Sequence, residues 1–192
     1  MSTTICPINK KIIQKDFAFY YAEDENGYVV YGMDENLSLV NIPSQIEGID
    51  VVAIGKQAFQ NFRIGELVMP DTITTIGEKA FSGCGKLKTV NIPKNVTIIG
   101  AEAFFNCFNI VSVTLSENIK EIGNKAFKQC KIESLNIPCS ICSIEEQALP
   151  YTVKSIEYGG TMKEWESVVK GKTFLDDCGH CTIFCSDGLL RA

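Results

Sequence analysis

Short runs of apolar residues recur along the chain at an interval of about 23 residues. In each run apolar side chains occupy the first, fourth and sixth positions, as in "LKTVNIP" from Leu87 to Pro93. This spacing predicts a short strand with one buried face, and the proline ends the strand because it has no N–H to donate. Such runs occupy residues 37–43, 64–70, 87–93, 110–116, 132–138 and 153–159.

A second motif follows the first five runs and reads Ile-Gly-x-x-Ala-Phe-x-x-Cys in its most complete copies. Its phenylalanine falls at Phe59, Phe81, Phe104 and Phe127, at intervals of 22, 23 and 23 residues, and Leu149 takes its place in the fifth copy. A fragment of this length cannot bury its own apolar side chains, whereas stacked copies can cover one another. The repeat therefore predicts a solenoid.

We expect a single-domain, mostly β solenoid of the α/β repeat type, with about five to six coils over residues 37–159. Two β-rich runs flank Asn26-Gly27, and this dipeptide is a strong hairpin signal. The pattern predicts a hairpin over 17–33, within an N-terminal cap that extends to residue 36. Residues 1–16 are expected to be loosely ordered.

Residues 160–192 are expected to form a C-terminal cap that contains a helix and a strand. Thr161 and Glu164 have the spacing of a capping box, which begins a helix. Trp165 lies on the apolar face of this helix and should cover the last coil. Gly171 is the expected end of the helix, and residues 181–188 are typical of a final strand and turn.

The recurrence of strand, proline, glycine, phenylalanine and cysteine resembles the BspA-type leucine-rich repeat of bacterial surface antigens, over about residues 37–152. The tail "IEYGGTMKEWESVV" is similar to the end of such proteins. The resemblance implies a short leucine-rich-repeat horseshoe that acts as a non-catalytic binding or adhesion module. It also implies a cell-surface or secreted location and an extracellular protein or glycan as the partner.

Leucine-rich repeats commonly carry asparagine or cysteine three residues after the last strand residue. This slot holds Asn95 and Asn118 here, but Thr72 and Ser140 in two other copies, which weakens the case for an asparagine ladder. Exposed strand positions form the concave surface in such repeats, and this surface is polar and lacks the aromatic anchors of tight interfaces. It is either a soluble sheet face or a surface that hydrogen-bonds an extended partner. The candidate binding residues are Asn41, Glu66, Thr89, Asn91, Ser112, Thr114, Ser134 and Asn136.

Charge and hydropathy exclude several classes of partner. The net charge is −5 and no cluster of lysine and arginine occurs, so nucleic acid is not expected to bind. No apolar run reaches the roughly 18 residues that a membrane span needs. The N-terminus shows no apolar signal segment, and we expect a monomer.

The candidates for chemistry are few. His180 is the single histidine of the chain, and no nucleophile elbow, phosphate loop or metal-binding helix motif occurs, so neither catalysis nor a cofactor is expected. Cys84, Cys107 and Cys130 share one slot of the repeat and are expected to be buried, reduced packing residues.

Three alternatives remain open. The segment with Cys178, His180 and Cys181 is a candidate zinc ligand set, and a zinc-stabilised module is one alternative. A disulfide within the tail is another, and the redox state is open for Cys139, Cys142, Cys178, Cys181 and Cys185. An intracellular protein-interaction scaffold is the third, because the chain shows no signal segment and many thiols.

Overall fold

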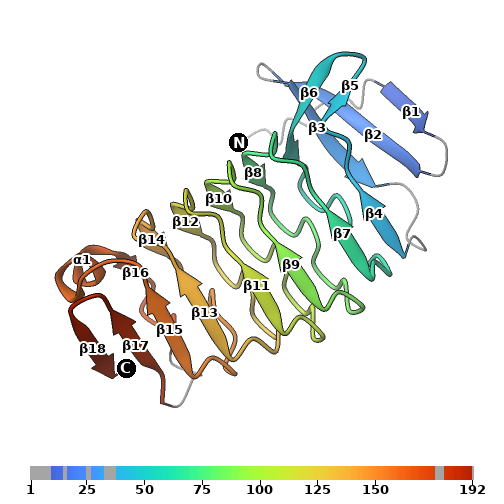
Figure 1. Ribbon diagram of the computed structural model, residues 1–192. Coiled ribbons are helices and arrows are strands. Elements are labelled where there is room, and N and C mark those ends of the chain that lie inside the picture. Colours follow the sequence, from blue (N-terminus) through green and yellow to red (C-terminus); the bar gives the residue numbers. More distant parts are fainter. Residues whose placement is uncertain (1–9, 15–16, 25–26, 33–37, 176–179, 192) are drawn as a thin grey trace, which may run out of the picture.

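The computed structural model describes residues 10–14, 17–24, 27–32, 38–175 and 180–191. It is a mostly β solenoid of about six turns, as the repeat predicts, and it is built as an elongated stack of coils (Figure 1). A hairpin lies at the N-terminal end of the stack, and a helix with two strands lies at the other end.

Each coil contributes a strand to one side of the stack, and we call the exposed side of these strands the strand face. Their inward side chains, such as Val40, Val90 and Ile156, are almost fully buried. The burial therefore follows the spacing of the apolar run. The strands are β4 (Leu39–Asn41), β7 (Glu66–Val68), β9 (Thr89–Asn91), β11 (Ser112–Thr114), β13 (Ser134–Ile137), β15 (Ser155–Tyr158) and β17 (Thr182–Cys185).

A second, longer sheet joins the coils on another side of the stack. It runs through parallel neighbours from the N-terminal cap to the C-terminal cap, and the buried Ile54, Ile76 and Ile99 pair in register within it. Its parallel strands are β3 (Gly27–Gly32), β6 (Ile49–Ile54), β8 (Thr75–Ile76), β10 (Ile98–Ile99), β12 (Glu121–Ile122), β14 (Ser143–Ile144) and β16 (Val169–Lys170).

The N-terminal cap is the expected hairpin with one additional strand. β2 (Phe17–Asp24) pairs antiparallel with β3, which confirms the hairpin. β1 (Lys10–Gln14) pairs antiparallel with β2, so the expectation of loose order is wrong for residues 10–14. The rest of 1–16 lies outside the described residues. The first repeat has extra residues between Pro43 and Val51, and they form a small hairpin in which β5 (Gln45–Ile46) pairs antiparallel with β6, away from the strand face.

The phenylalanine of each coil stacks on the phenylalanine of the next. Ring centroids are 5.2 Å apart between Phe59 and Phe81, 5.3 Å between Phe81 and Phe104, and 5.4 Å between Phe104 and Phe127. All four rings are fully buried, and Leu149 fills the next slot. Burial of each ring contributes roughly 1.5–3 kcal/mol, and the ladder predicted from the sequence is confirmed.

The segment around each phenylalanine contains residues in the left-handed region of backbone conformation. The residue two before the phenylalanine is one of them, and in successive coils it is Lys79, Glu102 and Lys125, with φ of 56°, 55° and 54°. Every second N–H of the segment donates to the next coil, as Phe81 does to Ala103 at 2.8 Å. The left-handed conformation costs a non-glycine residue roughly 1 kcal/mol of stability. The hydrogen bonds between coils offset that cost.

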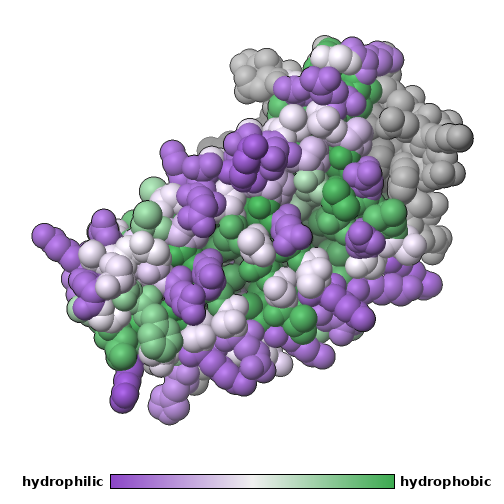
Figure 2. Space-filling model, viewed as in Figure 1, coloured by the Kyte–Doolittle hydropathy of each residue, from purple (hydrophilic) through white to green (hydrophobic). Residues whose placement is uncertain are grey.

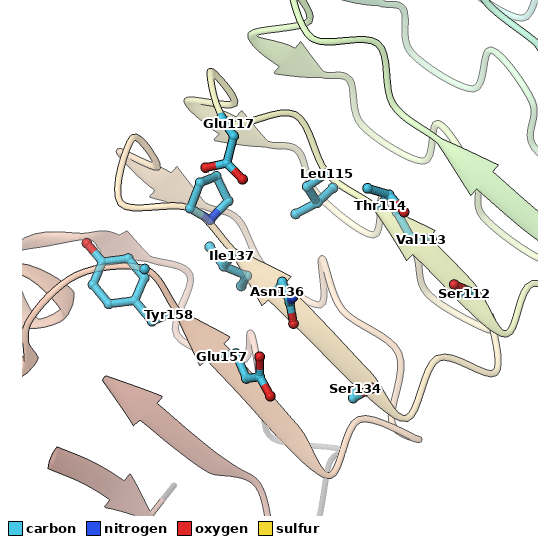
Figure 3. A pocket seen from close by; sticks show the side chains of 12 residues that line it. Ser112, Val113, Thr114, Leu115, Glu117, Ser134, Asn136, Ile137, Glu157 and Tyr158 are labelled. Carbon is cyan, nitrogen blue, oxygen red and sulfur yellow. The ribbon is translucent and has the colours of Figure 1, made fainter. Parts of the chain in front are cut away.

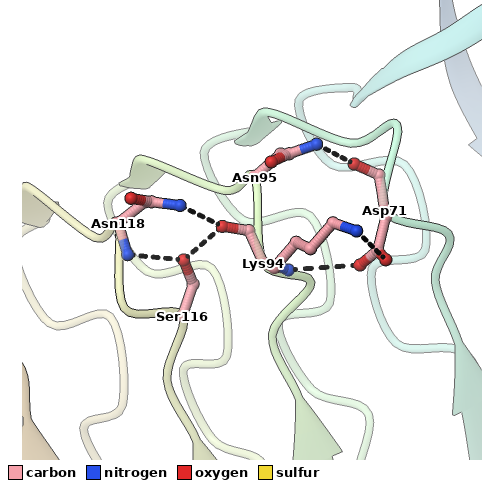
Figure 4. Close-up of polar contacts among 5 residues, drawn as sticks. All are labelled: Asp71, Lys94, Asn95, Ser116 and Asn118. Atoms are coloured by element: carbon pink, nitrogen blue, oxygen red, sulfur yellow. Dashed lines mark hydrogen bonds and ion pairs between the residues drawn. The ribbon is translucent and has the colours of Figure 1, made fainter.

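The slot three residues after the strand forms a polar ladder although two of its members are not asparagine. The amides of Asn95 and Asn118 donate to the carbonyls of Asp71 and Lys94 at 2.8 Å (Figure 4). Ser140 donates to Ile119 at 2.7 Å, and Thr72 makes the equivalent bond to Ser44 at 3.4 Å. Hydroxyl groups take the place of the amide in these two copies, so the slot is not a continuous asparagine ladder, as expected from the sequence.

The repeated cysteines are buried and hydrogen-bonded. Cys84, Cys107 and Cys130 are at most 1% exposed, and each thiol donates to the carbonyl of the phenylalanine one coil earlier. Burial raises the pKa of the Cys107 thiol to about 12, and it raises the pKa of the other two as well. These residues fill space, as expected, and they also link the coils.

The C-terminal cap completes the stack by replacing part of a coil with helix α1 (Met162–Ser167). Thr161 and Glu164 form the expected capping box, and Trp165 is buried. The helix ends at Ser167 rather than at Gly171, because Val169 and Lys170 join the long sheet as β16. β17 and the turn after it are the expected final strand and turn, and the chain continues into β18 (Gly188–Arg191), which pairs antiparallel with β17.

Replacing Phe104 with alanine should lower the free energy of unfolding by about 3–5 kcal/mol, because the ring has a stacked neighbour on each side and the change leaves a cavity. Amide hydrogen exchange should accelerate first in the adjoining coils, around Ile76–Phe81 and Ile122–Phe127. Leu149→Ala, next to the cap, is the control and should lower the free energy of unfolding by less. Uniform acceleration along the chain would contradict stacking.

Cys84, Cys107 and Cys130 should react with iodoacetamide more slowly than the exposed Cys139 and Cys142 in the native protein, by on the order of 100-fold or more, because exposing them requires local unfolding. Mass spectrometry after timed labelling measures the rates. All thiols should react alike in denaturant. A native rate for the repeated cysteines equal to that of Cys139 would show that they are not buried.

Lys125→Val should destabilise the protein by about 1–2 kcal/mol, because a β-branched side chain fits a positive φ poorly. Lys125→Gly should stay within about 1 kcal/mol of the parent, since glycine relieves the backbone strain but adds flexibility to the unfolded chain. Urea unfolding measures both. Lys131→Val is the matched control, because Lys131 is exposed and has no positive φ.

Candidate functional site

The predicted binding residues form two exposed columns on the strand face. Ladder pairing aligns Ser112 with Thr89 and Thr114 with Asn91. It also aligns Ser134 with Ser155 and Asn136 with Glu157. All eight residues predicted from the sequence are exposed, namely Asn41, Glu66, Thr89, Asn91, Ser112, Thr114, Ser134 and Asn136. The structure therefore brings them together on one surface.

The columns extend one strand further than the sequence analysis recognised. β17 pairs parallel with β15, so Thr182 continues one column and Phe184 continues the other, beside Glu157. Phe184 is 46% exposed, and the exposed Leu189 of β18 lies directly opposite it. The expectation that this face lacks an aromatic residue is thus wrong at its C-terminal end.

Apolar side chains are also exposed at the N-terminal end of the strand face. Leu39 and Val68 are more than two-fifths exposed on the first two strands of the strand face. Figure 2 shows hydrophobic surface across the middle of the view, interrupted by hydrophilic side chains. The strand face is therefore a mixed surface with apolar residues towards both ends.

The ladder of the strand face is interrupted between β11 and β13. In the described part of the chain these strands belong to separate sheets. The connections that precede them differ in length, because Phe108 and Asn109 separate Cys107 from Ile110 whereas Lys131 alone separates Cys130 from Ile132. The reverse change accompanies the interruption between β7 and β9, since Arg63 alone separates Phe62 from Ile64 whereas two residues separate Cys84 from Leu87.

A groove of about 550 Å³ lies at the interruption between β11 and β13. This volume lies in the range of small-molecule and peptide-anchor sites. Its apolar part is supplied by Val113, Leu115 and Ile137, and its polar rim by side chains of the two columns (Figure 3). The polar side chains of the groove are those of Ser112, Thr114, Glu117, Ser134, Asn136 and Glu157.

The groove is acidic. Glu117 and Glu157 line it, and its described lining contains no lysine, arginine or histidine. Elsewhere in the described residues exposed carboxylates form ion pairs, such as Glu133 with Lys154 at 2.9 Å. Neither groove carboxylate forms an ion pair with a described residue. Both are therefore available to a cationic partner.

Tyr158 connects the groove to the C-terminal cap. Its ring packs edge-on against Trp165 with centroids 5.0 Å apart, and the residue is only 5% exposed. Burial raises the pKa of its phenol, and the nearby Glu164 carboxylate adds to the shift. The Lys170 ammonium group lies 5.0 Å from the centroid of the Trp165 ring and donates to the carbonyls of Trp165 and Val168. The cap therefore fixes one end of the groove.

The residues considered for zinc are not brought together in the described part of the chain. His180 is exposed whereas Cys181 is buried, and Cys178 lies outside the described residues. No group of three or more histidine, cysteine, aspartate or glutamate side chains within the described ranges is arranged to hold a metal ion.

Among the described helices, none has the length and apolar character needed to cross a membrane.

Comparison with known proteins identifies the repeat. A family model described as a BspA type leucine rich repeat region, with 6 copies, matches residues 28–156. A leucine rich repeat protein of T. pallidum is 23% identical with a TM-score of 0.70, over 86% of this chain and 83% of that one. No curated protein sequence matches.

Two further solved structures have the same fold. A leucine-rich repeat protein from Bacteroides ovatus is 29% identical with a TM-score of 0.66, over 76% of this chain and 46% of that one. The pneumococcal vaccine antigen PcpA is 15% identical with a TM-score of 0.61, over 79% and 50%. This chain thus spans about half the length of these two proteins.

Proteins with this repeat are generally non-catalytic protein-binding modules and are typically surface-associated. The matched range contains the phenylalanine ladder, the cysteine slot and most of the strand face, which are the features that the repeat pattern specifies. On this evidence the chain belongs to the BspA-type leucine-rich repeat family.

Proposed function

We propose that this chain is an adhesion module of the cell surface that binds an extended protein partner along its strand face. The groove between β11 and β13 is the anchor point, and it receives a cationic side chain of the partner. The observation that carries this proposal is the coincidence of a groove of about 550 Å³ with two carboxylates that have no described ion-pair partner.

The polar columns support an extended partner. Serine, threonine and asparagine side chains carry both donors and acceptors, and within each paired group of strands they repeat at the strand spacing, about 4.8 Å. Weak hydrogen bonds along such a row add up when the partner follows it. Phe184, at the far end of the column from Asn41, supplies the kind of aromatic contact that dominates many interfaces.

An intracellular interaction scaffold is the second candidate. The observation in its favour is that Cys139 and Cys142 are exposed free thiols, which persist most easily in a reducing compartment. Fractionation of cells that produce the native protein distinguishes the two. Recovery on the outer surface supports adhesion, and recovery in the cytosol supports the scaffold.

The adhesion proposal predicts that Glu117→Gln combined with Glu157→Gln weakens partner binding by about tenfold or more, since both carboxylates face the cationic group. Biolayer interferometry against a panel of extracellular matrix proteins first finds the partner, and the variant is then compared with the parent. Binding of the parent should weaken as salt increases.

Glu146→Gln is the matched control, because Glu146 is exposed near the long sheet and away from the strand face. It should leave the affinity unchanged. An affinity that falls equally with the control variant, or that is unaffected by the groove variant and by Asn136→Ala, would contradict a site on the strand face.

A further inference from the structure

A second groove lies on an edge of the solenoid, where the phenylalanine motif of each coil leads into the next strand. It has a volume of about 480 Å³ and is formed by three successive coils. It shares no lining residue with the groove between β11 and β13. The side chains that line it are Asn61, Phe62, Arg63, Lys86, Phe108 and Asn109.

This groove is basic in a chain whose net charge is −5. Arg63 and Lys86 are exposed, and neither forms an ion pair or a side-chain hydrogen bond with a described residue. Among the described residues that line it there is no aspartate or glutamate. A guanidinium group binds a carboxylate through two parallel N–H bonds, and an ammonium group adds a point charge. The groove therefore favours an anionic ligand.

Two aromatic rings are fixed in the same groove. Phe62 packs edge-on against the buried Phe59, with ring centroids 5.7 Å apart. Phe108 is 49% exposed, and its ring lies over Gly85, where an added Cβ would come within 2.6 Å of a ring atom. An exposed ring that is held in place offers a flat apolar surface to a ligand at little cost in conformational entropy.

Amide side chains add hydrogen-bonding groups. Asn109 donates one N–H to the carbonyl of Gly85 at 2.6 Å, which orients its amide. A second N–H and the amide oxygen remain, and such a donor and acceptor pair suits the hydroxyl groups of a sugar. All lining residues lie in turns and loops, so the groove has no strand edge on which an extended peptide could pair.

We propose that this groove binds an acidic glycan, that is, a chain of sugars that carry carboxylate groups. The apolar face of a sugar ring packs on Phe108, the hydroxyl groups bond to Asn61 and Asn109, and Arg63 and Lys86 neutralise the carboxylate. The site is separate from the strand face and adds a second ligand class to the module.

Isothermal titration calorimetry on the full chain tests the proposal with a hexasaccharide of α-1,4-linked galacturonic acid and with 3′-sialyllactose. At least one should bind saturably. The fully methyl-esterified hexasaccharide should bind with an affinity at least about tenfold lower, because it keeps the sugar rings but lacks the charge. Arg63→Gln combined with Lys86→Gln should also weaken binding by about tenfold, and Phe108→Ala by about fivefold.

Lys88→Gln is the matched control, since Lys88 is exposed nearby but does not line the groove. This variant should bind the sugars with the affinity of the parent. Thermal unfolding verifies that every variant is folded. Absence of saturable binding by both sugars would overturn the proposal. So would binding of hexaglutamate as tight as that of the sugars and insensitive to Phe108→Ala, since that result assigns the groove to acidic peptides.

Discussion

Contact between neighbouring coils is the constraint on which the rest of the structure depends. A single coil leaves its phenylalanine, isoleucine and valine side chains open to water, so its fold exists only when another coil covers it. The stack of Phe59, Phe81, Phe104 and Phe127 is the most concentrated form of this contact, with rings 5.2–5.4 Å apart and almost parallel. The thiol hydrogen bonds of the cysteine slot reinforce it.

The close approach of the coils has consequences for the backbone. A Cβ at Gly100 would lie 2.7 Å from the backbone nitrogen of Glu78, so the glycine of the motif is needed where the chains meet. The left-handed residues let the chain donate hydrogen bonds across the stack in that narrow space. The spacing of the exposed columns on the strand face follows from this stacking, because each strand is fixed to the coil that carries it.

The features that repeat could be predicted from the sequence, and those that interrupt the repeat could not. The phenylalanine ladder, the buried cysteines and the exposed columns follow from positions that recur at 22 or 23 residues. Phe184 was missed because β17 is out of step with that interval. The repeat pattern does not predict the groove, because it lies where the strand ladder is interrupted next to β13, and its carboxylates lie on different coils.

The caps show the same limit. The capping box of Thr161 and Glu164 is a local signal and was found, but the helix ends early because Val169 and Lys170 pair with β14, which is a contact distant in sequence. Strand β1 likewise depends on pairing with β2 rather than on a pattern of its own. Local motifs therefore predict where elements begin, and tertiary pairing decides where they end.

Deletion of one complete coil, residues 82–104, tests the central claim most directly. If each coil is held by its neighbours alone, the shortened chain should bring Phe81 against Phe127, and it should unfold cooperatively in urea. The dependence of its unfolding free energy on urea concentration should fall roughly in proportion to the surface removed. Loss of cooperative unfolding, or a dependence unchanged from the parent, would contradict a fold built from stacked, interchangeable coils.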